Sequence, residues 1–304
     1  MLPFHVYDVF TDRPFAGNPL AIVEEADGLS DVQMQTIARQ FNLRETIFVQ
    51  TPDDPAHTAK VRIFTPGAEI PFAGHPTVGC AHHLARQHGL STVTLEERAG
   101  LVPVLIDGDL AEFTAPRLPA PIGTAPTREG VAAAVGLAAA EVGPHAPGAF
   151  EAGPAFLFAA VETLDALARA RPVEPGWSGM MQHAGIDDTG RSGVGLYLYA
   201  KTHAASGTDI RARMFAPDDG IPEDPATGSA TAILAAQLAA NGEIAPGTTT
   251  MTLHQGVEMG RPSLLRLTIE ATGVATGDGL SEVRVAGAAC PVSEGRIRTP
   301  GAPA

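Results

Sequence analysis

The sequence predicts an α+β protein made of two domains of similar construction, each a mixed β-sheet wrapped around one central helix. Three observations support this class. The chain has 304 residues, which is the length of about two ordinary domains. A sequence motif occurs twice, half a chain apart, and each copy leads into an apolar segment of helical length.

The repeat joins a strand-and-turn motif to a following helix. Residues 62–71, RIFTPGAEIP, align with residues 213–222, RMFAPDDGIP, and five of ten positions are identical. Residues 74–85, GHPTVGCAHHLA, align with residues 228–239, GSATAILAAQLA, and five of twelve positions are identical. Duplicated segments of this kind indicate two domains built alike, and we expect a pseudo-two-fold axis to relate them.

Each copy is expected to run from a strand through a turn and a loop into a helix. Val61–Phe64 and Ile210–Phe215 alternate β-branched or aromatic residues with polar ones and end just before a proline, as strands do. Thr77–Gln87 and Ala230–Ala240 have helix-forming composition and are apolar or small on nearly every face. Such helices belong in the centre of a domain.

The other elements complete two sheets and one outer helix. Ser30–Gln40 is amphipathic with a serine at the N-cap position, which predicts a helix outside the first sheet. Further strands are expected at Leu2–Val9, Leu20–Val23, Thr46–Val49, Thr92–Glu96, Val102–Ile106, Ala155–Val161, Gly195–Ala200, Thr249–His254, Leu264–Glu270 and Ser281–Ala286.

A proline-rich stretch marks the expected domain boundary. Residues 114–147 contain PRLPAPIGTAP and one alanine-rich helical segment, Arg128–Val142, and we interpret them as a linker. The boundary is placed near residue 120. This gives an N-terminal domain of residues 1–120 and a C-terminal domain of residues 121–304, whose last strand is allowed to cross back to the first domain.

Composition excludes several classes of protein. Acidic residues exceed basic ones by 14, and no Lys/Arg cluster is visible, so general nucleic-acid binding is not expected. Cys80 and Cys290 are the two cysteines, which is typical of a reducing compartment. We expect neither a signal peptide nor a membrane-spanning segment, and therefore a cytoplasmic protein that does not bind membranes.

The two central helices are expected to start at a shared binding cleft. Gly74 and Gly228 allow close approach of the backbone there, with His75 at the N-cap of the first helix and Ser229 at the N-cap of the second. Helix N-termini present unpaired N–H groups and the positive end of the helix dipole. A cleft of this kind binds an anion, most simply the carboxylate of a small substrate.

Three ionisable residues accompany these helix starts. His75 lies at the first helix, Asp224 lies five residues before Ser229, and Glu45 ends a short loop before a strand. Two carboxylates and an imidazole around an acid-binding cleft are suited to general acid–base transfer of a proton at carbon.

Five segments together carry a family resemblance. They are FTDRPFAGNPLAIV (10–23), NLRETIFV (42–49), RIFTPGAEIPFAGHPTVGCA (62–81), RMFAPDDGIPEDPATGSA (213–230) and HQGVEMGRPS (254–263). These segments resemble the PhzF-like family, which contains the phenazine-biosynthesis isomerase and its relatives, and the resemblance runs nearly end to end. It implies the diaminopimelate epimerase-like fold, with two pseudo-symmetric domains and usually a homodimer.

The resemblance also implies roles for single residues. Glu45 matches the catalytic glutamate, which in the phenazine enzyme takes a proton from one carbon of trans-2,3-dihydro-3-hydroxyanthranilate and returns it to another. His75, Asp224 and Ser229 match residues that bind and polarise that substrate, and Asn18 falls in the matching GNP segment. No metal, nucleotide or organic cofactor is implied, so the expected activity is a cofactor-independent isomerisation.

Some positions depart from related patterns. Cofactor-independent racemases of this fold carry two cysteines at the positions that Ala73 and Thr227 occupy here, and Cys80 lies further along the helix, which excludes a two-thiol mechanism. Arg44 stands where a small residue, often serine, is expected. A cation there would lower the pKa of Glu45 or bind a larger anion.

Two alternative functions stay open at this stage. One is an amino-acid epimerase or racemase that uses Glu45 and Asp224 on opposite faces of the substrate, and the other is a non-catalytic metabolite-binding protein. A metal site is not expected, because His82, His83 and His88 are not spaced by the four residues that place two ligands on one helix face.

Overall fold

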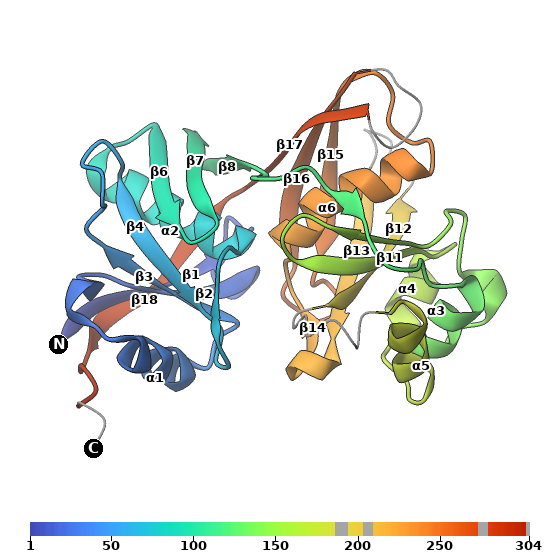
Figure 1. The fold of residues 1–304 in the computed structure, drawn as a ribbon, viewed down its shortest axis with the longest axis horizontal. Coiled ribbons are helices and arrows are strands. Elements are labelled where there is room, and N and C mark those ends of the chain that lie inside the picture. Colours follow the sequence, from blue (N-terminus) through green and yellow to red (C-terminus); the bar gives the residue numbers. More distant parts are fainter. Residues whose placement is uncertain (186–193, 203–208, 273–278, 302–304) are drawn as a thin grey trace. The chain divides into compact units, whose positions relative to one another are not determined.

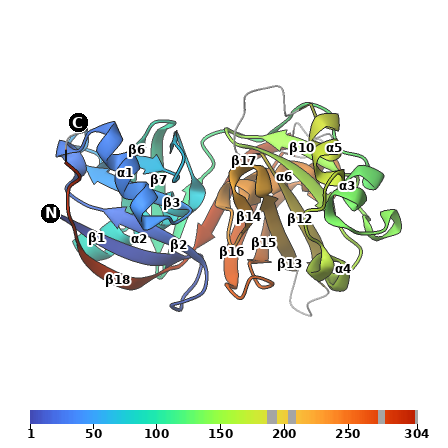
Figure 2. The ribbon, with the colours of Figure 1, turned by 90° about the horizontal axis from the view of Figure 1, so that it is seen from below.

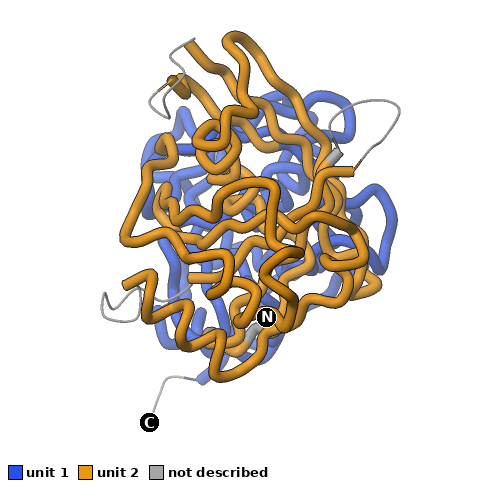
Figure 3. The backbone as a smooth tube through the Cα atoms, turned by 90° about the vertical axis from the view of Figure 1, so that its right-hand side faces the viewer, with its two compact units in different colours: residues 1–116, 286–304 blue, residues 117–285 orange. Residues whose placement is uncertain are grey.

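The computed structural model describes residues 1–185, 194–202, 209–272 and 279–301. The chain forms two compact units, which are residues 1–116 with 286–304 (unit 1) and residues 117–285 (unit 2) (Figure 3). Each unit combines a mixed β-sheet with a few helices, and the predicted α+β class is confirmed. The division differs from the expected domains, 1–120 and 121–304, chiefly at the C-terminus. The last strand of the chain pairs with the first, so residues 286–304 belong to unit 1.

Unit 1 is a mixed sheet with two helices. The sheet order is β18-β1-β2-β3-β4-β6-β7-β8, with β5 beside β4, and the pairs β2–β3 and β4–β6 are parallel. The elements are β1 (Leu2–Val9), β2 (Asn18–Val23), α1 (Asp31–Phe41), β3 (Glu45–Gln50), β4 (Ala59–Phe64), β5 (Glu69–Ile70), α2 (Gly74–His88), β6 (Thr92–Glu97), β7 (Gly100–Asp107), β8 (Leu110–Thr114) and β18 (Ala289–Ile297).

Helix α2 is the central helix of unit 1. It packs against β1, β2, β3, β6, β7, β8 and β18, so the sheet curves around it (Figure 1). The helix approaches the sheet closely at Gly79, where an added Cβ atom would lie 2.6 Å from the side chain of Leu20 and 2.7 Å from that of Val9. The predicted buried helix is confirmed, although it begins three residues earlier than expected.

Helix α1 covers the other face of the same sheet. Leu20 of β2 faces α2. Val23 lies three residues further along the strand and therefore points to the opposite face, where it packs in a core cluster with Met34 of α1 and Phe48 of β3. Ser30 is the N-cap, as predicted, and its hydroxyl accepts a hydrogen bond from the first turn of the helix.

Unit 2 repeats this plan with additional outer helices. The sheet order is β9-β10-β11-β12-β13-β15-β16, with β14 beside β13, and the pairs β11–β12 and β13–β15 are parallel. The elements are β9 (Ala120–Pro121), α3 (Arg128–Val135), β10 (Gly148–Glu151), β11 (Ala155–Ala160), α4 (Leu164–Arg169), α5 (Gly176–His183), β12 (Gly195–Thr202), β13 (Asp209–Ala216), β14 (Ile221–Asp224), α6 (Gly228–Ala240), β15 (Gly247–Gln255), β16 (Ser263–Ala271) and β17 (Leu280–Gly287).

Helix α6 is the central helix of unit 2. It packs against β10, β11 and β16, and it is apolar on all sides, as the sequence predicts for a buried helix. Figure 2 shows α3, α4 and α5 on the side of β12 and β13 away from α6. There they bury a second apolar cluster that includes Trp177, Leu157 and Phe215.

The two units share the same succession of strand pairs. In unit 1 the pairs β2–β3 and β4–β6 are parallel and enclose an antiparallel pair, and in unit 2 the pairs β11–β12 and β13–β15 do the same. Arg62 forms a bidentate pair with Glu69 at 2.7 and 2.7 Å, and Arg213 forms one with Glu223 at 2.8 and 2.8 Å. The predicted repeat is therefore visible in the topology, and each unit has a bidentate Arg–Glu ion pair that starts from the arginine of the repeat.

Some predicted elements differ from those observed. The helix expected over Arg128–Val142 ends at Val135, because Gly136 adopts the left-handed conformation that terminates helices. The stretch interpreted as a linker belongs instead to the folded structure of unit 2. In the described part of the chain, the helices are too short or too polar to cross a bilayer.

Candidate active site

In each unit, the candidate residues gather at the start of the central helix. In unit 1, Glu45 is the first residue of β3, and Gly74 and His75 begin α2. Asn18 begins β2, two residues before Leu20, which is the partner of Glu45 in the parallel β2–β3 pair. The strand register and the helix start therefore bring the predicted residues of unit 1 to one place.

The helices begin at the glycines, which corrects the predicted N-caps. The N–H of Thr77 bonds to the carbonyl of Ala73 at 3.2 Å, and the N–H of Thr231 bonds to the carbonyl of Thr227 at 2.9 Å. Ala73 and Thr227 are thus the N-caps, and the two predicted caps, His75 and Ser229, are second helical residues. Neither N-cap side chain bonds to its helix, which leaves first-turn N–H groups for a ligand.

Glu45 and His75 form a buried ion pair. Nδ1 of His75 lies 3.0 Å from Oε2 of Glu45, and the two side chains are 4% and 9% exposed. On the other side, Nε of Arg44 lies 3.8 Å from Oε1 of Glu45. The carboxylate therefore sits between an imidazole and a guanidinium.

These neighbours set the pKa of Glu45. Burial alone would raise it, but the charge of His75, the hydrogen bond from its imidazole and the charge of Arg44 together outweigh burial, and the pKa is lowered. Glu45 is a carboxylate at neutral pH, which is the form a general base requires. Arg44 acts in the direction predicted from the sequence.

The far side of the His75 ring carries an unsatisfied nitrogen. Nε2 of His75 is buried and has no hydrogen-bond partner among the residues that the structure describes. Buried polar atoms are rarely left in this state. The nitrogen opposite the Glu45 contact is therefore the atom through which His75 can bind a ligand.

A further buried carboxyl group, Glu97, anchors the start of α2. The hydroxyl oxygen of Thr77 lies 2.7 Å from Oε1 of Glu97 and 2.8 Å from the carbonyl of Ala73. Burial raises the pKa of Glu97 to about 8, against the opposing effect of the Thr77 hydrogen bond. The Thr77 hydroxyl, which donates to Glu97, therefore links this buried carboxyl group to the start of α2. No motif in the sequence indicates a role for Glu97.

In unit 2, Asp224 is held by the residue that caps α6. Asp224 is the last residue of β14 and is buried, and the Thr227 hydroxyl donates to its Oδ2 at 2.5 Å. Gly228 begins the helix and Ser229 follows it, half-buried. The predicted residues of unit 2 therefore also lie around one helix start.

Gln255 completes this second group, and sequence reasoning missed it. Its side-chain amide donates to the Asp224 carbonyl at 2.8 Å and to the Thr227 hydroxyl at 2.9 Å. Its side-chain oxygen accepts from the Thr227 N–H at 3.2 Å and from the Tyr197 hydroxyl at 3.3 Å. Burial raises the pKa of Tyr197, so this hydroxyl keeps its proton. The signal for Gln255 was the family segment 254–263, in which it is the second residue.

The thiol positions agree with the exclusion of a two-cysteine mechanism. The N-cap positions of α2 and α6 are occupied by Ala73 and Thr227. Cys80 is buried in α2, where burial raises the pKa of its thiol. A thiol with a raised pKa is a poor nucleophile and a poor base near neutral pH.

The family model described as phenazine biosynthesis-like protein matches residues 7–295. An uncharacterised isomerase of Mesorhizobium japonicum is 37% identical over 96% of this chain and 97% of its own. The trans-2,3-dihydro-3-hydroxyanthranilate isomerase of Pseudomonas aeruginosa is 36% identical over 96% of this chain and 97% of its own.

Two solved structures agree with this result over whole chains. A PhzF-family phenazine biosynthesis protein of Bacillus anthracis has a TM-score of 0.83 at 25% identity and covers 98% of this chain and 99% of its own. A protein of Pseudomonas aeruginosa described as a predicted epimerase has a TM-score of 0.76 at 30% identity, over 99% and 100% of the two chains. The chain is therefore an enzyme of the isomerase type and belongs to the PhzC-PhzF family of phenazine biosynthesis-like proteins.

Proposed function

We propose that this enzyme moves a proton between two carbons of a small carboxylic acid, that Glu45 is its single base, and that no cofactor takes part. The observation that carries the proposal is the buried Glu45–His75 pair, with the carboxylate ionised and the far imidazole nitrogen unsatisfied. A substrate that meets both groups encounters a base and a hydrogen-bonding partner in one place.

In the proposed reaction, Glu45 removes a proton from one carbon of the substrate. The electron pair of the broken C–H bond forms a new C=C bond, and the existing double bond shifts. Protonated Glu45 exchanges its proton with solvent and delivers a proton to the carbon at the other end of the shifted system. The substrate is isomerised without gain or loss of atoms. Nε2 of His75 binds a polar group of the substrate and holds the reacting carbons next to Glu45.

The group in unit 2 is proposed to bind and polarise the substrate. Asp224 provides a fixed carboxylate for a cationic or hydrogen-bond-donating group, because Thr227 and Gln255 hold it in place. The first-turn N–H groups of α6, together with Ser229, are proposed to bind the substrate carboxylate. Substrate binding between the two helix starts, the homodimer and the cytoplasmic location stay predictions.

The first substrate to test is trans-2,3-dihydro-3-hydroxyanthranilate, because the Pseudomonas aeruginosa isomerase named for this compound is 36% identical over nearly the whole chain. The purified protein is incubated with it in deuterium oxide, and the product is followed by absorbance and mass spectrometry. We expect a new conjugated chromophore and one solvent deuterium at carbon. Glu45→Gln should give neither, whereas the exposed control Glu129→Gln should behave as the wild type. Equal turnover in wild type and Glu45→Gln would exclude Glu45 as the base.

An epimerase is the second candidate. It is favoured by the solved structure described as a predicted epimerase, and by Asp224 as a second buried carboxylate. Epimerisation changes optical rotation without creating a chromophore. Deuterium at a stereocentre with unchanged absorbance would therefore favour the epimerase over the proposed isomerisation.

A further inference from the structure

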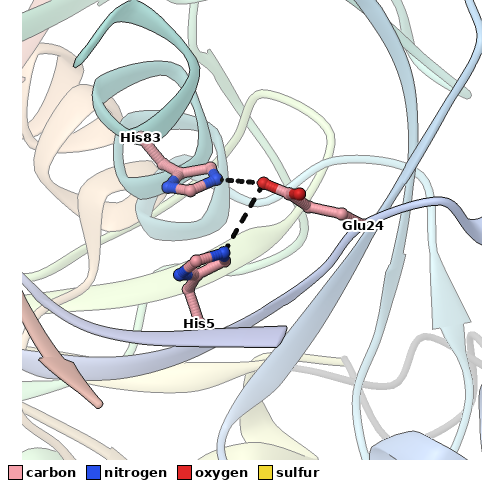
Figure 4. A group of neighbouring side chains, drawn as sticks. All are labelled: His5, Glu24 and His83. Carbon is pink, nitrogen blue, oxygen red and sulfur yellow. Dashed lines mark hydrogen bonds and ion pairs between the residues drawn. The ribbon is translucent and has the colours of Figure 1, made fainter. Parts of the chain in front are cut away.

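Three residues that the proposed reaction does not use form a compact cluster in unit 1. His5 lies on β1, Glu24 directly follows β2, and His83 lies on α2 (Figure 4). Nε2 of His83 lies 2.5 Å from Oε1 of Glu24, and Nε2 of His5 lies 3.6 Å from the same oxygen. The three potential ligand atoms are within 4.8 Å of one another.

We propose that His5, Glu24 and His83 bind a divalent transition-metal ion, with Zn²⁺ as the best match. Two imidazole nitrogens and one carboxylate oxygen are a common donor set for zinc, with bonds of roughly 2.0–2.2 Å. Tetrahedral ligands at that distance are about 3.4 Å apart. The observed separations of 2.5 and 3.6 Å lie on either side of this spacing, so small side-chain movements would admit the ion.

The hydrogen bonding around His83 permits metal binding. Its Nδ1 lies 3.1 Å from the Tyr7 hydroxyl. That hydroxyl can donate when Nε2 carries the ring proton, and it can accept when a metal occupies Nε2 and the proton moves to Nδ1. Metal-binding histidines commonly have such an outer partner. Metal binding therefore leaves no buried nitrogen of His83 unsatisfied.

The other histidine of the cluster also has an outer partner. The second nitrogen of His5 lies 3.7 Å from Glu294, a carboxylate that would orient this ring in turn.

An open pocket gives the ion access. It has a volume of about 460 Å³, and its lining includes both histidines, Tyr7, Arg86 and Glu294. Water entering from this pocket would complete the coordination. The spacing of His82, His83 and His88 in the sequence predicts no metal site, and His5 and Glu24 lie too far from His83 along the chain for a local motif to include them.

The test is metal binding by the full-length, tag-free protein after dialysis against a chelator. Zinc chloride is titrated calorimetrically, and cobalt chloride is titrated by visible absorption, which reports imidazole and carboxylate coordination. We expect one equivalent bound by the wild type. Because loss of an outer partner alone commonly weakens binding 10- to 100-fold, loss of a ligand should weaken it at least about 100-fold in Glu24→Gln and in His5→Gln.

The control is His88→Gln, an exposed histidine at the end of the same helix, which should bind zinc like the wild type. Circular dichroism shows whether each variant is folded. If one of the two ligand variants, Glu24→Gln or His5→Gln, fails to fold, the zinc affinity of the other decides the test. The proposal is overturned if the wild type binds no zinc, if a folded Glu24→Gln or His5→Gln binds it with unchanged affinity, or if His88→Gln weakens binding as much.

Discussion

The two helix starts share a framework but differ in chemistry. In unit 1, an ionised Glu45 contacts His75, whose far nitrogen is unsatisfied among the described residues. In unit 2, Asp224, Thr227 and Gln255 are joined by hydrogen bonds between neighbouring groups. The first group is equipped to exchange a proton with a ligand, and the second is equipped to hold a fixed shape.

The repeat shows how this difference arises. Phe64 and Phe215 are equivalent in the repeat, and their strand partners are Thr46 and Leu196. Glu45 therefore corresponds to Gly195, where a Cβ atom would lie only 2.6 Å from the carbonyl oxygen of Phe215. Unit 2 has no room for a side chain at the position of the base. The proposed base of unit 1 therefore corresponds to a glycine in unit 2.

The largest effects on activity are expected from substitution of the two carboxylates, Glu45 and Asp224. Glu45→Gln removes the base and should lower kcat by roughly 10³-fold, within the range for general bases. Asp224→Asn keeps the shape of the side chain and should chiefly raise KM, because the proposed role of this residue is binding. Steady-state kinetics with circular dichroism as a folding control test this. A larger loss of kcat in Asp224→Asn would reverse the assignment.

The pH dependence of stability should come from unit 1 through Glu97. Its folded pKa of about 8 exceeds its unfolded value, so its contribution is fully present below about pH 4.5 and is lost as pH rises through 8. The loss amounts to roughly 5 kcal/mol. Glu97→Gln should therefore resist urea better than wild type at pH 9 and differ little at pH 4. Identical pH dependence in both proteins would contradict the buried, protonated Glu97.

The hydrogen-bonded group of unit 2 should be sensitive to loss of Gln255. Gln255→Ala leaves the Asp224 carbonyl and the Thr227 N–H buried without this partner, which should cost about 2–3 kcal/mol of unfolding free energy. Tyr197→Phe removes one hydroxyl and should cost about 1 kcal/mol. Urea unfolding measures both, and equal small losses would mean that the group does not hold the site rigid.

His75→Gln tests whether His75 lowers the pKa of Glu45. The variant should lose roughly 10- to 100-fold in kcat/KM. Removing the imidazole charge and its hydrogen bond raises the pKa of Glu45, so more of the base is protonated at a given acidic pH. The acidic limb of the kcat/KM profile should therefore move to higher pH. An unmoved limb would show that His75 does not set the ionisation of Glu45.

The smallest effect is expected at Arg44. Its charge is the weakest of the influences that lower the pKa of Glu45, and its Nε lies 3.8 Å away. Arg44→Ser should move the acidic limb in the same direction as His75→Gln, but by less. A shift larger than that of His75→Gln, measured in the same pH series, would reverse the order of the two neighbours.

The sequence predicted the features that repeat or that lie in continuous motifs. The two central helices, the Ser30 cap and the gathering of Glu45 with His75 followed from periodicity, cap chemistry and family motifs. Glu97 and Gln255 were missed because each acts through partners at least 20 residues away, which local patterns do not reveal. The predicted N-caps, His75 and Ser229, lie two residues beyond the observed ones. Gly74 and Gly228 are themselves the first helical residues, so the N-caps are Ala73 and Thr227.

The most direct test is solvent exchange at the reacting carbon under saturating substrate. Wild type, Glu45→Gln and Asp224→Asn are compared in deuterium oxide by mass spectrometry, with trans-2,3-dihydro-3-hydroxyanthranilate as substrate. We expect Asp224→Asn to incorporate deuterium once substrate is saturating, and Glu45→Gln to incorporate none. Incorporation by Glu45→Gln together with its loss in Asp224→Asn would place the base in unit 2 and exclude Glu45 as the base.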